Sequence, residues 1–273
     1  MLKEPNENIV KKTKQTRLRQ NFVDIHCHCL PSLDDGPATL ADATVLCAAL
    51  ADDGIRCVVA TPHQLGRFDG RNGSAKVRDA VCELNTQIRK AGIQLDVLPG
   101  AEVRIDERVC KLLDEDNILT LADGGRYILL ELPHETFIDI APLLQQLVSL
   151  QVIPIISHAE RYDILAAQPN IISKWLDIGA HLQVTACSLT GQLGQQAKKV
   201  GWYFLASGYV SVIATDAHDT NQRCPVMTAA FYKISLKLGA DTARLLTIEN
   251  PTRIISGKEL VPLPLLEHKQ VRQ

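Results

Sequence analysis

The motif DIHCH at residues 24–28 carries the strongest chemical signal in the sequence. Apolar residues of high β propensity precede it, so we expect it to end a strand, in which alternate side chains share a face. His26 and His28 then point to the same side, about 6–7 Å apart, where two imidazoles can converge on one cation. Taken alone, such a pair is equally compatible with two hydrogen-bonded histidines in a half-buried strand.

Four further stretches place a potential ligand at the end of an expected strand. They are Thr61-Pro62-His63, Gly100-Ala101-Glu102, Ser157-His158-Ala159-Glu160-Arg161 and Asp216-Ala217-His218. In a barrel of parallel strands the C-terminal strand ends meet around one mouth, so residues distant in sequence become neighbours. Five of the eight histidines, together with Glu102 and Asp216, would gather there. Histidines buried only for packing have no reason to choose the same end of every strand, so the set favours a site for several metal ions.

A pair of aspartates lies in the turn that follows the first expected strand, within PSLDDGP at 31–37. Aspartate in a turn commonly accepts hydrogen bonds from its own backbone. One of the two, Asp34 or Asp35, could instead reach the metal mouth.

Seven short β-rich runs alternate with helical patterns from residue 22 to about 250 and would position these residues. The expected strands are Phe22–His26, Arg56–Ala60, Gln94–Leu98, Tyr127–Leu132, Val152–Ser157, His181–Thr185 and Tyr209–Thr215. The expected helices are Leu40–Asp53, Ala75–Lys90, Ile140–Leu150, Ile171–Ile178 and Val226–Leu238, the first two with Thr39 and Ser74 as N-caps. Several strands are almost continuously apolar, as in a parallel sheet covered on both faces. The alternation predicts an α/β fold with one closed or nearly closed barrel, and a doubly wound open sheet is the alternative.

Composition limits the remaining possibilities for this chain of 273 residues with a formal net charge of -2. Residues 1–20 are basic and poor in apolar residues, so we expect a disordered arm before a single catalytic domain at 21–273. The N-terminus lacks the apolar region of a signal peptide, and no apolar run reaches the ~18 residues of a membrane span. We therefore expect a cytoplasmic protein without a membrane span, and the near-neutral charge gives no indication of nucleic-acid binding. The oligomeric state stays open.

The eight cysteines do not support thiol-based phosphate chemistry. A cysteine-dependent tyrosine phosphatase needs an arginine six positions after its cysteine, and no cysteine here has one. Most of them lie in apolar stretches, where a free cysteine behaves as a small buried hydrophobe. Without a signal peptide, we expect reduced thiols.

Taken together, the motifs resemble the PHP (polymerase and histidinol phosphatase) superfamily. Within it, the chain is most similar to the bacterial metal-dependent protein-tyrosine phosphatases of capsule and exopolysaccharide loci. The resemblance runs from about Phe22 to the end of the chain. It is carried by DIHCHCLPSLDDGP (24–37), ADDGIRCVVATPH (51–63), PGAEVRI (99–105), YILLELP (127–133), VIPIISHAERYD (152–163), VIATDAH (212–218) and NPTRII (250–255). It implies a distorted seven-stranded (βα)7 barrel of the TIM-like type.

The resemblance also implies three metal sites. One ion would be held by His26, His28, Glu102 and Asp216. Glu102 would bridge to a second ion that His158 also binds, and a third would be held by Asp35, His63 and His218. Asp35 is chosen over Asp34 because the second aspartate of the DDG turn matches the ligand in similar phosphatases.

Two arginines complete the expected site. Arg161 and Arg223 match positions where these phosphatases place guanidinium groups against the substrate phosphate, and with Asp216 they form the expected catalytic set. Both arginines could instead form surface salt bridges. Thr185 stands where relatives often have Asn, which could alter hydrogen bonds around the ligands. His134 follows the ELP motif and is a possible substrate-loop residue.

The expected reaction is hydrolysis of a phosphomonoester. Clustered divalent ions bind phosphoryl oxygens, lower the pKa of bound water and stabilise charge on both sides of the phosphorus. The hypothesis is in-line attack by a metal-bound hydroxide, without a phosphoenzyme. Imidazole and carboxylate ligands suit Mn²⁺, Fe²⁺ or Zn²⁺, and the resemblance favours three Mn²⁺ ions.

The resemblance implies a phosphotyrosine substrate, namely the tail of a tyrosine autokinase from the same kind of locus. Three alternatives stay open at this point. They are a small-molecule phosphatase such as histidinol-phosphate phosphatase, a polymerase-associated nuclease domain, and a metal-stabilised binding module without catalysis.

Overall fold

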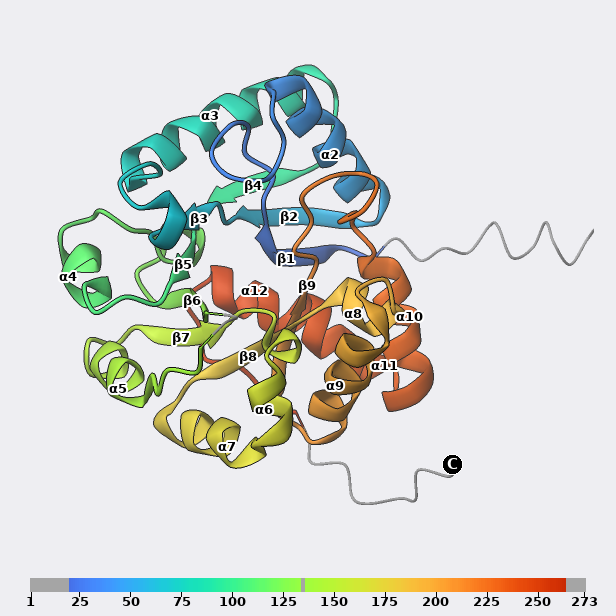
Figure 1. Cartoon of the computed structure of the whole chain (residues 1–273). Coiled ribbons are helices and arrows are strands. Elements are labelled where there is room, and N and C mark those ends of the chain that lie inside the picture. The colour runs from blue at the N-terminus through green and yellow to red at the C-terminus, as the bar shows by residue number, and fades with distance from the viewer. Residues whose placement is uncertain (1–19, 134–135, 264–273) are drawn as a thin grey trace, which may run out of the picture.

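The computed structural model describes residues 20–133 and 136–263, and Figure 1 shows central parallel strands surrounded by helices. The strands are β1 (Phe22–Cys27), β2 (Ile55–Ala60), β3 (His63–Gln64), β4 (Asp96–Pro99), β5 (Glu102–Arg104), β6 (Tyr127–Glu131), β7 (Ile153–Ile156), β8 (His181–Thr185) and β9 (Val210–Ala214). The longer helices are α2 (Leu40–Asp52), α3 (Ser74–Lys90), α5 (Ala141–Ser149), α7 (Pro169–Ile178), α9 (Gly194–Ala206) and α10 (Met227–Leu238). Shorter helical segments are η1 (Gly66–Phe68), α4 (Val109–Asp114), η2 (Leu121–Asp123), η3 (Ala159–Arg161), α6 (Asp163–Ala167), α8 (Ala186–Thr190), α11 (Ala240–Arg244), η4 (Leu245–Glu249) and α12 (Asn250–Ile255).

All seven predicted strands and all five predicted helices are present, with ends that differ by at most two residues. Thr39 caps α2 as expected, because its hydroxyl accepts a hydrogen bond from the backbone N–H of Asp42. The cap of α3 is Gly73, however, and Ser74 is already the first helical residue. The sequence pattern missed β3 and β5, which have two and three residues, and also the 13-residue helix α9.

The seven-stranded barrel that we expected, closed or nearly closed, is not confirmed. Among the described residues, hydrogen bonds divide them into a sheet of order β1-β2-β4 and a sheet of order β3-β5-β6-β7-β8-β9, with parallel pairing throughout. Thr61 and Pro62 separate β2 from β3, and proline has no N–H to donate to a neighbouring strand. Gly100 separates β4 from β5, where a Cβ atom would lie 2.5 Å from Cγ1 of Val59. The α/β architecture with parallel strands is therefore confirmed, and the closed barrel is not found.

The first and last strands meet at their C-terminal ends. The N–H of Asp216 donates to the carbonyl of His26 at 2.8 Å, and the N–H of His28 donates to the carbonyl of Ala217 at 2.9 Å. The buried carboxylate of Asp24 accepts a further bond from the N–H of Thr215, 191 positions away in sequence, at 2.9 Å. These bonds fix the DIHCH motif against the TDAH segment.

Alternate strand residues pack into two separate apolar cores. Leu129 and Ile155 belong to an inner core between the strands, which Ile254 of α12 closes. The neighbouring residues Leu130 and Ile156 belong to an outer core between strands and helices. Because side chains alternate along a strand, a residue two positions beyond an inner-core residue points inward again, at the C-terminal mouth.

Two sequence predictions fall wholly or partly outside the described residues. Of the expected basic arm at 1–20, only Gln20 is described, and His134 is not. No helix in the described part of the chain is long and apolar enough to span a membrane.

Candidate metal centre

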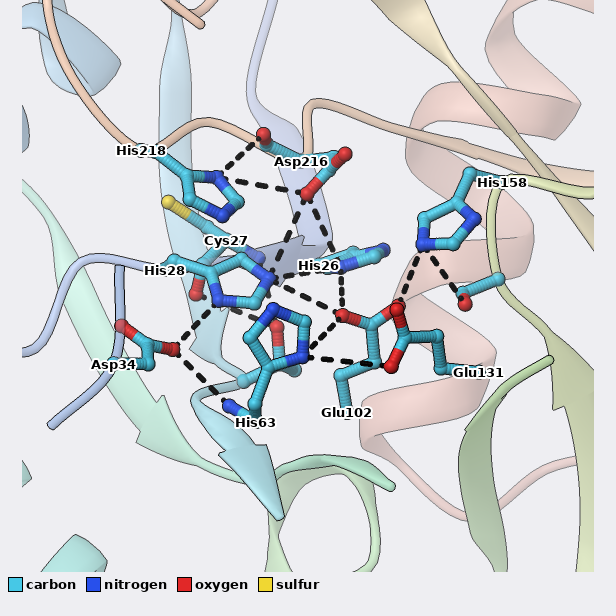
Figure 2. A network of polar contacts seen from close by, with 12 residues as sticks. His26, Cys27, His28, Asp34, His63, Glu102, Glu131, His158, Asp216 and His218 are labelled. Carbon is cyan, nitrogen blue, oxygen red and sulfur yellow. Dashed lines mark hydrogen bonds and ion pairs between the residues drawn. The ribbon is translucent and has the colours of Figure 1, made fainter. Parts of the chain in front are cut away.

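Imidazoles and carboxylates from six strand segments, or from the turns directly after them, converge on one region (Figure 2). They are His26 and His28 at the end of β1, His63 in β3, Glu102 in β5, Glu131 at the end of β6, His158 after β7, and Asp216 and His218 after β9. The structure thus brings together the residues that the sequence analysis selected, and adds Glu131.

Four atoms form the tightest group, which we call the first ligand group: Nε2 of His26, Nε2 of His28, Oε2 of Glu102 and Oδ1 of Asp216. The two nitrogens lie 3.2 Å apart. Glu102 Oε2 lies 3.3 and 3.4 Å from them, and Asp216 Oδ1 lies 3.4 and 3.6 Å from them. Four ligands about 2.1 Å from an ion sit about 3.4 Å apart at the corners of a tetrahedron. The separations among His26, His28 and Glu102 therefore match the ligand spacing around a small divalent cation, and Asp216 lies at a similar distance from both nitrogens.

Glu102 lies at the centre of the whole arrangement. Its Oε1 is 2.9 Å from Nε2 of His158, and its Oε2 is 3.2 Å from Nδ1 of His63. The side chain is 1% exposed, and neither oxygen has a hydrogen bond of acceptable geometry among the described residues. A buried carboxylate without a proper hydrogen-bond donor is costly, and a bound cation removes that cost. The donor set around Glu102 therefore fits metal ions.

The two aspartates of the DDG turn have different surroundings. Oδ1 of Asp35 lies 3.4 Å from Nε2 of His63 and 3.4 Å from Nε2 of His218. These residues, with His28, make up a group of possible ligand atoms within 4.8 Å of one another. Asp34 instead accepts a hydrogen bond from Nδ1 of His28 at 2.7 Å, which turns Nε2 of that ring toward the first ligand group.

Glu131 is a candidate ligand that the sequence analysis missed. Its ligand atom groups with those of His63 and Glu102, and its Oε2 lies 3.8 Å from Nδ1 of His63. Glu131 follows the inner-core residue Leu129 by two positions and ends β6, so it obeys the same strand-end rule as the other candidates.

Two of the inward-pointing residues have a left-handed backbone. His158 has a φ of 31° and Asp216 a φ of 53°, a region that costs a residue with a Cβ atom about 1–2 kcal/mol. The sharp turns direct both side chains back into the mouth. Such strain persists only where surrounding contacts hold it, and it concentrates at functional sites.

Electrostatics keeps the carboxylates ionised. Burial opposes the charge on Glu102 and Asp216, but neighbouring histidines, and the arginines in the case of Asp216, outweigh it and hold both pKa values well below their usual range. Burial lowers the pKa of His158 and of His218 to about 4, so both rings are neutral near pH 7. Burial also opposes the charge on His28, yet Asp34 and Glu102 raise its pKa to about 10. The carboxylates that stabilise the protonated, positively charged ring would stabilise a bound metal cation in the same way.

Arg161 and Arg223 both reach the centre through Asp216. Nη2 of Arg223 donates to Oδ1 and Oδ2 of Asp216 at 2.8 and 2.7 Å, and Nη2 of Arg161 donates to Oδ2. The two arginines also line a cavity of about 450 Å³. The other residues that line this cavity are Asp35, His63, Leu65, Gly66, Arg67, Phe68, Glu102, Arg104, Glu131 and His158. Both of these guanidinium groups, together with Arg67 and Arg104, therefore line the space in front of the ligand atoms.

The structure separates the remaining polar residues from the centre. His181 pairs with the hydroxyl of Ser211 at 2.8 Å and does not belong to any of the possible ligand groups. Thr185 Oγ1 lies 3.5 Å from Nε2 of Gln183, at the outer limit of a hydrogen bond. Cys27 and Cys29 are buried in the outer core, and all eight cysteines are free thiols.

Comparison with known proteins gives a consistent assignment. Residues 22–256 match the family model described as "Capsular polysaccharide synthesis, CpsB/CapC". The chain is 33% identical over 244 residues to tyrosine-protein phosphatase YwqE of Bacillus subtilis, covering 89% of this chain and 95% of that protein. It is 30% identical to tyrosine-protein phosphatase CpsB of Streptococcus pneumoniae, covering 86% and 98%. A crystal structure from work on YwqE and CpsB, described as "unique metal-dependent tyrosine phosphatases", superposes with a TM-score of 0.85 at 32% identity, covering 89% of this chain and 97% of that chain.

Proposed function

The chain belongs to the CpsB/CapC family of capsular polysaccharide synthesis, and on that basis we propose that it is a metal-dependent protein-tyrosine phosphatase. The observation that carries the proposal is the first ligand group, in which Glu102 and Asp216 each lie 3.3–3.6 Å from the two imidazole nitrogens, the spacing of ligands around a divalent cation. The missing CX₅R motif argues against a cysteine nucleophile. A metal-assisted hydrolysis needs no thiol.

We assign the ligands to three ions. The first ligand group would hold one ion. Glu102, Glu131 and His158 would hold a second, supported by the 2.9 Å contact between Glu102 and His158 and by the place of Glu131 beside Glu102. The third ion would be held by Asp35, His63 and His218. Mixed imidazole and carboxylate donors favour Mn²⁺, with Fe²⁺ or Zn²⁺ as other ions of suitable size and softness.

Bound divalent ions supply charge neutralisation and activate water for attack on phosphorus. The chain's own contribution is to bind and orient the phosphate. Arg161 and Arg223 would donate paired hydrogen bonds to its oxygens, a geometry that lysine cannot reproduce. Their shared contact with Asp216 keeps both guanidinium groups beside the ligand atoms before substrate arrives.

The cavity also suits an aromatic phosphoester. Leu65 and Phe68 line it together with the arginines, and the Phe68 ring stacks on the His63 ring at 5.4 Å and 9°. These apolar groups offer contact to a phenyl ring whose phosphate reaches the ligand atoms. We therefore propose a phosphotyrosine substrate, and as its physiological source the tail of a tyrosine autokinase of a capsule or exopolysaccharide locus.

The decisive experiment combines metal removal with a choice of substrates. Exhaustive chelation should abolish hydrolysis of phosphotyrosine peptides, and added Mn²⁺ should restore it. The same preparation should hydrolyse phosphoserine peptides and histidinol phosphate more slowly. Activity that survives chelation would contradict the metal mechanism, whereas a preference for histidinol phosphate would identify a small-molecule phosphatase.

A further inference from the structure

One buried amide touches ligands of two different ions. Gln183 lies in β8 and is 0% exposed. Its neighbours Leu182 and Val184 pack into the outer core, so Gln183 points to the opposite, inner face. There its Oε1 accepts a hydrogen bond from the backbone N–H of His158 at 2.8 Å and lies 3.0 Å from Nδ1 of His26.

These two contacts determine where the proton of His26 resides when its other nitrogen binds a cation. A backbone N–H only donates, so the atom of Gln183 that faces His158 must be the carbonyl oxygen. That oxygen cannot donate, so Nδ1 of His26 must carry the hydrogen in their shared bond. The lone pair of Nε2 is then left to face the first ligand group.

We propose that Gln183 is a positioning residue that couples the first and second ion sites. Its single oxygen sets the tautomer and ring orientation of His26 and also holds the left-handed backbone of His158, from which that ligand turns inward. This inference rests on the proposed function and deepens it. Asp34 has the corresponding place on the other side of the centre, because its Oδ2 accepts from Nδ1 of His28 at 2.7 Å and from the backbone N–H of His63, a ligand of the third ion, at 3.1 Å.

Loss of the amide oxygen should therefore weaken two ions together and spare the third. Groups that orient metal ligands typically contribute 10–100-fold to metal affinity. Asp35, His63 and His218 have no contact with Gln183 among the described hydrogen bonds, so the third ion serves as an internal reference.

The test is Mn²⁺ binding to the full chain, measured by calorimetric titration and elemental analysis after dialysis. Gln183→Met, which removes the oxygen at similar volume, should lose about 10–100-fold in affinity for two ions and retain the third. Gln183→Glu, which keeps an acceptor oxygen, should restore most of that affinity. The matched control is His181→Gln, which disrupts the other end of the same strand and should leave all ions bound. If Gln183→Met does not fold, Gln183→Asn, whose shorter amide cannot reach both partners, replaces it.

Several results would overturn the inference. They are unchanged Mn²⁺ affinity in the methionine variant, equal loss in His181→Gln, loss of one ion only, or failure of Gln183→Glu to restore binding. A wild-type protein that binds no Mn²⁺ would instead contradict the proposed function itself, so the two failures are distinguishable.

Discussion

Replacing Arg161 by alanine separates phosphate binding from metal binding. The guanidinium of Arg161 is about one-fifth exposed and donates to Asp216, which is itself buried. Arg223 keeps two hydrogen bonds to the same carboxylate, at 2.8 and 2.7 Å, so Asp216 stays oriented when Arg161 is removed. Guanidinium does not bind metal cations at working pH. The variant should therefore retain its ions.

The expected loss is in rate. Deleting one donor to a developing oxyanion costs about 3–4 kcal/mol in a well-studied protease, and an arginine shared with a second one should cost about 2–4 kcal/mol here. At about 1.4 kcal/mol for each factor of ten, this is a loss of roughly 30–1000-fold in kcat/KM. Asp216→Ala should behave differently, because it removes an oxygen 3.4 and 3.6 Å from the two Nε2 atoms of the first ligand group. Both bound metal and rate should fall in that variant.

Elemental analysis and kinetics on a phosphotyrosine peptide, run on the same samples, provide the measurement. Arg161→Lys is the matched control, since it keeps the charge but not the paired hydrogen bonds, and should recover only part of the rate. A variant Arg161→Ala with full metal content and near-normal kcat/KM would refute the assignment and make Arg223 the first residue to examine. Loss of metal from Arg161→Ala would show that the arginine supports Asp216 rather than the substrate.

Three further predictions follow from the same geometry. Asp35→Asn should lower Mn²⁺ stoichiometry by one ion while the first ligand group stays loaded, and loss of all ions on elemental analysis would contradict the assignment. Burial lowers the pKa of His181 from 6.5 to about 4, so its contribution to stability is complete above pH 6.5 and is lost as the pH falls toward 4. His181→Gln should consequently flatten the decline of the unfolding free energy in that window, and an unchanged decline in denaturant titrations would count against it. Burial raises the pKa of Cys27 to about 11 and of Cys187 to about 12, so iodoacetamide at pH 7.5 should label the exposed Cys82 and spare those two. Mass spectrometry that finds Cys187 labelled in the folded protein would contradict this prediction.

The seven longer strands and five of the six long helices were predictable because their apolar patterns match what each element buries; α9 was not predicted. The run VIPIIS, for example, became β7, whose residues divide between the inner and outer cores. No local sequence pattern, by contrast, determines whether the strands close into a barrel. Whether two strands pair edge to edge depends on backbone details such as Pro62, and strands of two or three residues such as β3 and β5 are too short to show a period.

The candidate ligands were predictable for a related reason: they follow strands at their C-terminal ends, and parallel strands present those ends together. The choice between Asp34 and Asp35 could be made from the sequence only through resemblance. It depends on the path of a turn, and the structure places one carboxylate on Nδ1 of His28 and the other between two imidazoles.

Glu131 and Gln183 mark where the sequence argument stops. Glu131 obeys the same strand-end rule as the other candidates, but a glutamate at the end of a strand is usually a solvated residue, so its type alone does not single it out. Gln183 lies inside a strand, and the sequence alone shows only one polar residue between two apolar ones. Its amide oxygen contacts the backbone N–H of His158 and the imidazole of His26, which lie 25 and 157 positions away in sequence. Only the three-dimensional arrangement brings those two partners to the same atom. A metal centre assembled from strand ends can be predicted from the types of its ligands, whereas the groups that orient those ligands are defined by contacts that no local pattern encodes.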